Sequence, residues 1–453
     1  MARQNNLGTD KIGPLVWRIA IPSMLAQFVS VLYSIVDRIN VGHIPEVGDL
    51  ALAGIGVCGP IVTMIGAFAF WIGIGGAPLM SISMGEERPE RAKQILGNCA
   101  MLLVVLSVVL TGVVLAVKEP MLRAFGASGA SYPYAVRYFT IYVSGTIFAL
   151  LSTGLNQFII AQGNAKAGMV SVIIGAIMNI ALDPVFIFVL DMGVAGAAYA
   201  TIISQACSMV FVVWFLLKRA QVRLSIGSYQ LKIIGKVLLL GISPFLIISM
   251  DNVMIIALNA LMQKFGGPEQ GDILITTNAI VQSFMLILTM PLGGISGGTQ
   301  SILSFNYGAR QSKRVMQASY YIMALCAGFS ALMFVTARVA GPQFVSLFTQ
   351  DPVIAAQAVR AIKICTLLAA PLGIQYAIVD GFTAMGLVRF SLPLSLWRKF
   401  SYFLAVFTIP FLFGIENIFY AEPFSDFMGP LVSVTLYLLV MKKTLKKREE
   451  LQR

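Results

Sequence analysis

The chain has 453 residues, of which 58% are hydrophobic and 11% are charged, and its mean hydropathy is +0.84. A soluble core cannot hide so much apolar surface, so the composition excludes a soluble protein and indicates a polytopic membrane protein. The net charge of +12 raises nucleic acid as a partner, and the placement of the cations decides that question.

Apolar runs recur along the whole chain, each about 20 residues and therefore long enough to cross roughly 30 Å of hydrocarbon. They predict an all-α fold of twelve transmembrane helices. In chain order the predicted spans are residues 14–40, 51–83, 95–117, 134–162, 169–190, 195–217, 233–262, 274–305, 315–340, 357–385, 394–414 and 426–441. The polar N-terminus before a long first span predicts insertion without a cleavable signal peptide.

The cations are distributed unequally across the membrane. With twelve spans and a cytoplasmic N-terminus, 24 of the 32 Lys and Arg residues fall on the cytoplasmic side, three of them in residues 389–399 and six at the C-terminus. This excess follows the positive-inside rule and predicts that both termini are cytoplasmic. Membrane topology therefore explains the charge without nucleic acid. The run Lys442–Arg448 is expected to anchor the last helix against anionic lipid.

An internal repeat with a constant offset of 223 residues organises the chain. Its landmarks are Gly48-Asp49-Leu50 with Gly271-Asp272-Ile273, Gly85 and Arg91 with Gly308 and Arg314, Ala135-Val136-Arg137 with Ala358-Val359-Arg360, and Gly163 with Gly386. The repeat predicts an N-lobe over residues 1–220, a cytoplasmic linker over 221–230 and a C-lobe over 231–453. Because six helices per lobe is an even number, the lobes are expected to be related by a pseudo-two-fold axis along the membrane normal, with a central cleft.

The sequence carries no pattern typical of enzyme chemistry. Its five cysteines are scattered singly and it has one histidine, His43, so neither a disulfide framework nor a zinc site is expected. It contains no nucleophile elbow or phosphate-binding loop, and the GxGG of residues 73–76 has no dinucleotide-binding context. We expect no enzymatic activity and no cofactor.

Four aspartates fall within the predicted spans: Asp37, Asp183, Asp251 and Asp380. A carboxylate at the centre of a bilayer costs about 2.5–3.5 kcal/mol on insertion scales, so each is a functional candidate that faces a cavity or a partner. The alternative is a residue at a helix end that reaches the interface. That alternative applies most directly to Asp37, which lies beside Arg38.

Asp183 forms a motif with Asn179, four residues earlier, and is followed by Pro184. The i, i+4 spacing sets both side chains on one helical face. A carboxylate and a carboxamide facing inward can bind a proton, or coordinate a hard cation such as sodium through oxygen. The alternative is a structural role, in which Asn179 and Asp183 only hydrogen-bond to each other within the packed helices.

These features together resemble the multidrug and toxic compound extrusion (MATE) transporters over essentially the whole chain. The resemblance rests on Ile21-Pro22 and Asp37 to Gly42 in the first helix, Gln162-Gly163-Asn164, the Asn179 to Pro184 motif, and Gly196-Ala197-Ala198-Tyr199-Ala200-Thr201. The Asn-x-x-x-Asp-Pro element is similar to the prokaryotic branch named for a DNA-damage-inducible member (DinF-like).

The resemblance implies an ion-coupling site in the N-lobe. Asp37, Asn179 and Asp183 match that site, and Thr201 matches a threonine that completes a sodium site in related members. These four residues are the implied metal ligands if the coupling ion is sodium. Pro22 matches the proline at which the first helix bends when the aspartate changes its protonation state.

Other branches of the family place coupling acids in helices seven and ten. Asp251 and Asp380 lie near those places, with Asp251 where a glutamate is usual, so they are candidates for coupling or for substrate contact. Asp380 is the repeat mate of Gln157. Asn156 and Gln157 are expected to line the N-lobe side of the cleft.

The resemblance implies a secondary antiporter of a prokaryotic plasma (inner) membrane. It would export organic, mostly cationic compounds in exchange for H⁺ or Na⁺ by alternating access, and a monomer suffices for this. One alternative is a flippase for lipid-linked oligosaccharides or cell-wall precursors, which needs cationic residues in its cavity. A channel and a membrane enzyme are the alternatives from other classes.

Overall fold

A computed structural model describes residues 5–45, 47–125 and 129–450, without the side chains of residues 49, 52, 256, 268, 269 and 272. The repeat landmarks Asp49 and Asp272 therefore lie outside the described side chains. The described residues form helices and contain no β-strand, which confirms the predicted all-α fold.

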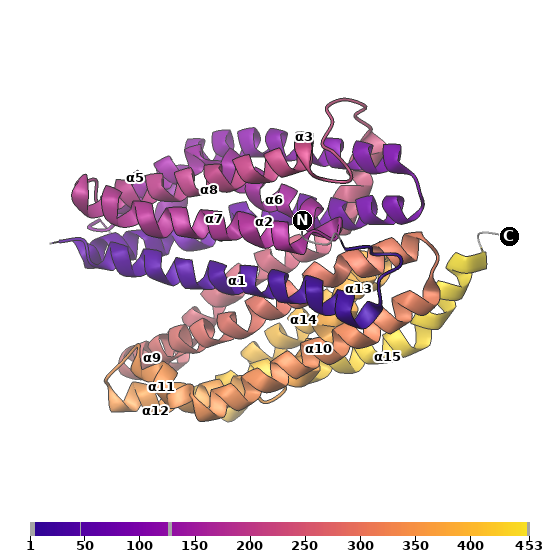
Figure 1. Ribbon diagram of the computed structural model, residues 1–453. Coiled ribbons are helices and arrows are strands. Elements are labelled where there is room, and N and C mark those ends of the chain that lie inside the picture. Colours follow the sequence, from indigo (N-terminus) through magenta and orange to yellow (C-terminus); the bar gives the residue numbers. More distant parts are fainter. Residues whose placement is uncertain (1–4, 46, 126–128, 451–453) are drawn as a thin grey trace. The chain divides into compact units, whose positions relative to one another are not determined.

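Most helices follow one another with short connections, and a longer one, residues 219–230, joins α8 to α9 (Figure 1). In chain order they are α1 (Ile12–Gly42), α2 (Gly48–Gly85), α3 (Pro89–Ala116), α4 (Lys118–Ala124), α5 (Tyr132–Ser144), α6 (Thr146–Ala161), α7 (Ala165–Pro184), the π-helix η1 (Val185–Val189), α8 (Val194–Lys218), α9 (Leu231–Gly308), α10 (Ser312–Val339), α11 (Gly341–Ser346), α12 (Pro352–Cys365), α13 (Ala369–Ala384), α14 (Val388–Phe413), the 3₁₀-helix η2 (Ile415–Tyr420) and α15 (Ala421–Glu450).

The twelve predicted spans are confirmed within the described residues, as ten continuous apolar helices and two bent pairs. α9 contributes two of the ten, because Gly267 interrupts it with a φ of 68°. The fourth and tenth spans are each a bent pair of helices. α5 meets α6 at 55° and α12 meets α13 at 50°. The first bend lies at Gly145. Its backbone N–H donates a hydrogen bond to Tyr142 O at 3.0 Å, which closes a tight turn.

The backbone repeats with the offset found in the sequence. Four helices have a counterpart that begins 223 residues later: α3 and α10, α4 and α11, α6 and α13, and α7 and α14. The left-handed backbone positions repeat too, since Glu87 and Arg310 both have φ 58°, and Gly163 and Gly386 have φ 80° and 72°. The duplicated architecture is therefore present in the fold as well as in the sequence.

The chain forms two compact units. Unit 1 comprises Met1–Asn6 and Leu25–Ile248, and unit 2 comprises Leu7–Met24 and Ser249–Arg453. The predicted lobes divide the chain within the linker 221–230, whereas these units divide it inside α1, two residues after Pro22, and inside α9. The start of α9 belongs to unit 1 because it packs closely on α2: Trp71 Nε1 donates to Leu238 O at 2.8 Å, and Gly241 lies against the Trp71 carbonyl.

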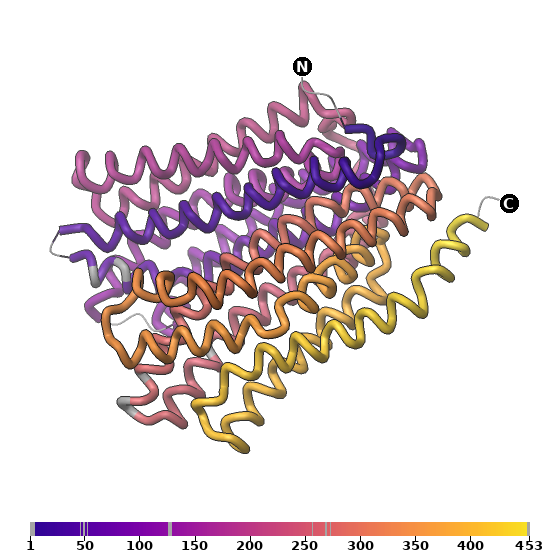
Figure 2. The backbone as a smooth tube through the Cα atoms, turned by 60° about the horizontal axis from the view of Figure 1, so that its bottom comes forward, coloured from indigo at the N-terminus to yellow at the C-terminus, as the bar shows by residue number. Residues whose placement is uncertain are grey.

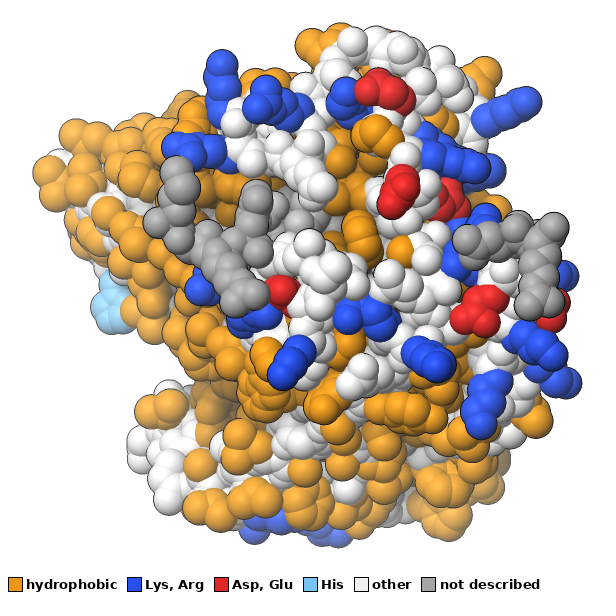
Figure 3. Space-filling model, turned by 45° about the vertical axis from the view of Figure 1, so that its right-hand side comes forward, with side chains coloured by type: hydrophobic (Ala, Val, Ile, Leu, Met, Phe, Trp, Pro, Cys, Tyr) orange, Lys and Arg blue, Asp and Glu red, His pale blue; other side chains and the backbone are white. Residues whose placement is uncertain are grey.

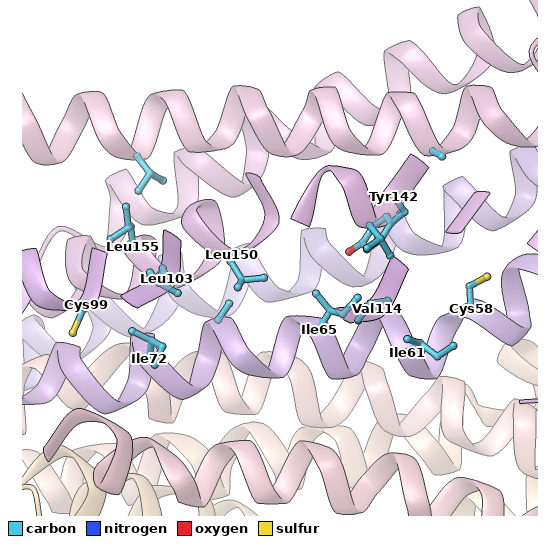
Figure 4. Packing of buried hydrophobic residues seen from close by; sticks show 14 of the residues in the cluster. Cys58, Ile61, Ile65, Ile72, Cys99, Leu103, Val114, Tyr142, Leu150 and Leu155 are labelled. Atoms are coloured by element: carbon cyan, nitrogen blue, oxygen red, sulfur yellow. The ribbon is translucent and has the colours of Figure 1, made fainter. Parts of the chain in front are cut away.

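Unit 1 is built around α2, which packs against α3, α5 and α6, while α8 packs against α5, α6 and α7. Figure 4 shows its core, in which Cys58, Ile61, Ile65 and Ile72 of α2 lie among buried side chains of neighbouring helices. Small and β-branched side chains let these helices approach closely.

Unit 2 repeats this arrangement with its own helices. α10 packs along α13, and α15 packs against both α13 and α14 (Figure 2, orange to yellow). Its outer surface is apolar, with Leu438 and Leu439 of α15 being 68% and 65% exposed. On the face drawn in Figure 3, the charged side chains gather together and hydrophobic side chains cover the adjoining surface. This separation suits a protein that contacts lipid along its flanks.

Candidate ion-coupling site

Asp183 lies near the end of α7, where the α-helix widens. Pro184 follows it and the chain continues as the π-helix η1, closed by Leu190 N donating to Val185 O at 2.8 Å. A Cβ at Gly196, in the first turn of α8, would lie 2.6 Å from the Phe186 carbonyl. The small residues at the start of α8 thus let it approach this turn, and π-helical turns of this kind are frequent at functional sites.

The predicted pair of Asn179 and Asp183 is fully inside unit 1. Their exposed fractions are 2% and 0%, and Asn179 Nδ2 donates to Asp183 Oδ1 at 3.2 Å. The structure also brings Asp37 of α1 within hydrogen-bonding reach of the Asp183 carboxyl, with Asn40 beside them. Three of the four predicted coupling residues therefore meet at one place, from helices far apart in sequence.

This carboxyl pair, Asp37 and Asp183, is incompletely satisfied by the protein. Asp37 Oδ1, Asp183 Oδ2 and Asn179 Oδ1 are buried and have no hydrogen-bond partner among the described residues. Among the described residues, no Lys or Arg nitrogen lies within 4 Å of either carboxyl. Two carboxyls can hydrogen-bond to each other only when one carries a proton, and buried carboxylates otherwise need a cation. The site therefore has the chemistry of a proton site or of an oxygen-ligand site for a hard cation.

Tyrosines border the carboxyl pair. Tyr138 interacts electrostatically with both carboxyls, and Tyr33 interacts with Asp37. The Tyr138 ring stacks on Tyr142 with a centroid distance of 6.0 Å, and both are buried. The Tyr142 hydroxyl lies beside the amide of Gln205 on α8. The sequence did not single out these tyrosines, because a tyrosine in an apolar span ordinarily packs against its neighbours.

The other residues predicted for the N-lobe lie apart from the carboxyl pair or have their own partners, and Pro22 belongs to unit 2. Thr201 Oγ1 donates to Ala197 O of its own helix at 2.9 Å, and no hydrogen bond joins it to the carboxyl pair among the described residues. Asn156 is buried and accepts from Ser171 Oγ at 3.1 Å, which ties α6 to α7. Gln157 packs on α2 at Gly73. Pro22 lies inside α1, which is assigned as one helix from Ile12 to Gly42.

The two acids predicted in unit 2 do not meet each other directly. Asp251 of α9 forms an ion pair with Lys399 of α14. Asp380 of α13 accepts a hydrogen bond from Ser296 Oγ at 2.5 Å. Asp380 therefore has a hydroxyl partner, and Asp251 has a cation. Unit 2 holds its acids differently from unit 1.

A charge network in unit 2 was not predicted. The Arg398 guanidinium contacts Asp426 at 3.0 Å and Glu422 at 3.1 Å, and the Asp426 side chain is fully buried. Four charged side chains, Asp251, Arg398, Lys399 and Glu422, line a cavity of about 200 Å³ together with Tyr376 and Tyr402. We call Arg398, Lys399, Asp251, Glu422 and Asp426 the unit 2 charge network.

The sequence contained a signal for this network. Glu422 and Asp426 have the same i, i+4 spacing as Asn179 and Asp183, but the predicted last span began only at residue 426, so Glu422 was placed outside it. Arg398 and Lys399 were counted among the cytoplasmic cations, and their pairing with acids was not predicted. Both lie about 15 Å along α14 from its first residue, at 1.5 Å per residue, and both are paired with acids inside unit 2.

The fold defines a polytopic membrane protein built from two repeated halves. The MatE family model matches the chain twice, at residues 22–185 and 248–411, and the chain belongs to this family of MATE transporters. Its assignment to the DinF-like branch stays a prediction. The double match agrees with the internal repeat.

Relatives and solved structures cover nearly the same length. The multidrug export protein MepA of Staphylococcus haemolyticus is 22% identical over 89% of this chain and 88% of its own. MepA of Staphylococcus aureus is 21% identical over 95% and 94%. An outward-facing multidrug resistance MATE transporter and a transporter of the MOP superfamily from Pyrococcus furiosus each superpose with a TM-score of 0.89. Both are 22% identical and cover 97% of this chain and 98% of theirs.

Proposed function

We propose that the protein is a secondary antiporter that exports organic cations in exchange for H⁺ or Na⁺. The observation that carries this proposal is the carboxyl pair, in which Asp183 is fully buried and Asp37 is partly buried. Arg38 acts on Asp37 electrostatically, but among the described residues no Lys or Arg nitrogen lies within 4 Å of either carboxyl. Such a site requires a positive charge from outside the protein. An incoming ion and a cationic substrate can both supply it, so they compete.

The similarity of the whole chain to proteins named for multidrug export supports a small-molecule substrate. Competition then gives directionality. With the carboxyl pair ionised, an amphipathic cation is held; when H⁺ or Na⁺ neutralises the pair, the attraction is lost and the substrate leaves. About 2.3 kcal/mol is available for each elementary charge at 100 mV, which is enough to bias two states separated by a few kcal/mol.

Asp37, Asp183 and Asn179 would hold the coupling ion through their oxygens. Thr201 lies on the neighbouring helix α8 and would join them only as a further oxygen ligand for sodium. In the same proposal Pro22 marks the bend of α1, Asn156 and Gln157 line the substrate path, and Asp251 and Asp380 assist from unit 2. The protein would work without a cofactor or enzymatic step, as a monomer, with both termini in the cytoplasm.

The flippase alternative requires free cations in a cavity to meet phosphates. Arg398 and Lys399 line the unit 2 cavity, but each is paired with a carboxylate. Within this cavity the pairing favours the antiporter, because neither of its two cations is free to meet a phosphate.

The decisive experiment is dye efflux from proteoliposomes under a pH gradient alone and under a sodium gradient alone. We expect saturable efflux under at least one gradient, and its loss in Asp183→Asn. Asp191→Asn is a matched control, because Asp191 is exposed after η1 and its left-handed backbone suits asparagine. Full gradient-driven efflux by Asp183→Asn would refute the site. Ohmic single-channel currents would refute a carrier, and flipping of a lipid-linked sugar without ion exchange would favour the flippase.

A further inference from the structure

Unit 2 contains a basic pocket where the end of α9, the start of α14 and the last turns of α15 meet. The pocket has a volume of about 590 Å³ and no acidic side chain in its lining. Four cations line it: Arg389 of α14, and Lys443, Lys447 and Arg448 of α15. Four like charges repel one another, so this arrangement favours a bound anion.

The two arginines are held in place by aromatic rings. Arg448 lies over the Tyr307 ring with a centroid distance of 5.0 Å, and its Nε donates to Tyr307 O at 3.4 Å. Arg389 lies over the Phe390 ring at 4.6 Å. Among the described residues no carboxylate pairs with Arg389, Lys443 or Lys447. Arg389, Lys443 and Lys447 are therefore not neutralised by a described carboxylate, which is the condition for capturing a phosphate oxygen.

One wall of the pocket is apolar. Leu387, Leu439 and Val440 line it, and Leu439 is 65% exposed. From Leu439 to Lys447 the helix rises about 12 Å at 1.5 Å per residue. Over that distance the lining changes from aliphatic to cationic. The same change in polarity occurs across the glycerol region of a phospholipid, between the first acyl carbons and the phosphate.

We propose that this pocket binds an anionic phospholipid. The phosphate lies among Arg389, Lys443, Lys447 and Arg448, and the first part of an acyl chain covers Leu439 and Val440. A free phosphate would meet the cations but leave the aliphatic wall uncovered. Basic pockets between transmembrane helices are suited to such headgroups. The proposal is independent of the transported substrate and of the coupling ion.

The test compares two pairs of lysines on α15. Lys443 and Lys447 line the pocket, whereas Lys442 and Lys446 are also exposed on α15 but do not line it. The variants Lys443→Gln/Lys447→Gln and Lys442→Gln/Lys446→Gln therefore have the same net charge. The full chain in detergent is titrated with phosphatidylglycerol and with phosphatidylcholine of the same acyl chains, and bound lipid is counted by native mass spectrometry.

We expect the unsubstituted chain to bind phosphatidylglycerol about tenfold more tightly than phosphatidylcholine, with the preference lost in the pocket variant and changed less than about threefold in the control variant. Millimolar inorganic phosphate should not displace the lipid. Equal losses in both variants would indicate a diffuse basic surface and overturn the proposal. Displacement by phosphate would indicate a free-anion site and overturn it as well. If the double variant does not fold, Arg389→Gln tests the same pocket from α14, and an unchanged lipid preference would contradict the proposal.

Discussion

The two halves of the molecule share a backbone plan but treat buried acids in opposite ways. α7 of unit 1 and α14 of unit 2 are repeat counterparts. α7 supplies Asp183, whose carboxyl neighbour is another acid, whereas α14 supplies Arg398 and Lys399, which neutralise acids of other helices. At the repeat positions of Asn179 and Asp183, α14 has Tyr402 and Val406. The duplicated halves thus share a backbone arrangement, but a few side chains give them different buried charges.

This difference separates a pair of acids with no described Lys or Arg nitrogen within 4 Å from a network in which each cation is paired with an acid. A buried carboxylate without a cation is costly, so we expect the carboxyl pair of unit 1 to respond to an ion that reaches it. In unit 2, Arg398 and Lys399 face three acids, and the ion pairs hold α9, α14 and α15 together. We therefore expect substitutions in unit 1 to affect transport and substitutions in the unit 2 charge network to affect stability first.

The largest expected effect is on transport by the carboxyl pair. Asp37→Asn and Asp183→Asn should each reduce gradient-driven efflux by about 100-fold or more, because each removes one acid from a single site. The double variant should be no slower than either single variant, since the remaining acid has no independent role. Initial efflux rates in proteoliposomes measure this. Losses that multiply in the double variant would mean that the two acids act at separate steps.

The next largest effect is on the stability of unit 2. Arg398→Met removes the cation from a network in which Asp426 is fully buried, and should destabilise the protein by about 3–5 kcal/mol. Thermal unfolding in detergent measures the loss. Adding Glu422→Gln and Asp426→Asn to Arg398→Met should recover a large part of it, because the uncompensated charges are then gone. A stable Arg398→Met protein would show that the network is not structural.

The sequence predicted the backbone of both halves much better than their charges. Apolar length located all twelve spans, and the landmarks at Gly85, Gly163 and Arg91 gave the offset that the helix starts follow. The i, i+4 rule also identified Asn179 and Asp183. These features depend on local spacing, which one sequence displays directly.

Tertiary pairing was not visible in the same way. Whether Asp37 meets Asp183, and whether Arg398 lies in water or against Asp426, depends on which helices become neighbours, and residue type does not determine that. Asp251 illustrates the problem. It was singled out as an intramembrane acid, but its partner Lys399 was assigned to the cytoplasm because charge counting treats every cation near a span end alike. The bends at residue 145 and near residue 366 were likewise hidden inside continuous apolar runs.

A smaller effect on stability is expected for the hydrogen bonds that fix the segment before a long helix in each unit, α9 in unit 1 and α1 in unit 2. In unit 1, Gln162 accepts from Val222 N at 2.7 Å and its Nε2 donates to Val222 O at 3.3 Å. In unit 2, Arg314 donates to the carbonyls of Leu7 and Asp10 instead. Gln162→Leu should cost about 1–3 kcal/mol, because the buried Val222 amide loses its partner. Thermal unfolding tests this, with Gln221→Leu on the exposed side of the same segment as the control.

The smallest effect is expected for the second ion pair of the unit 2 charge network. Lys399 is mostly buried, but the Asp251 side chain is 51% exposed, so water can solvate the acid when the lysine is removed. Lys399→Gln should therefore cost about 1 kcal/mol or less, in contrast to Arg398→Met one residue earlier. The difference in melting temperature between the two variants measures how far exposure, rather than ion pairing itself, determines the cost. A loss for Lys399→Gln as large as that for Arg398→Met would mean that Asp251 is buried in the membrane-embedded protein, and that unit 2 contains two deep ion pairs rather than one.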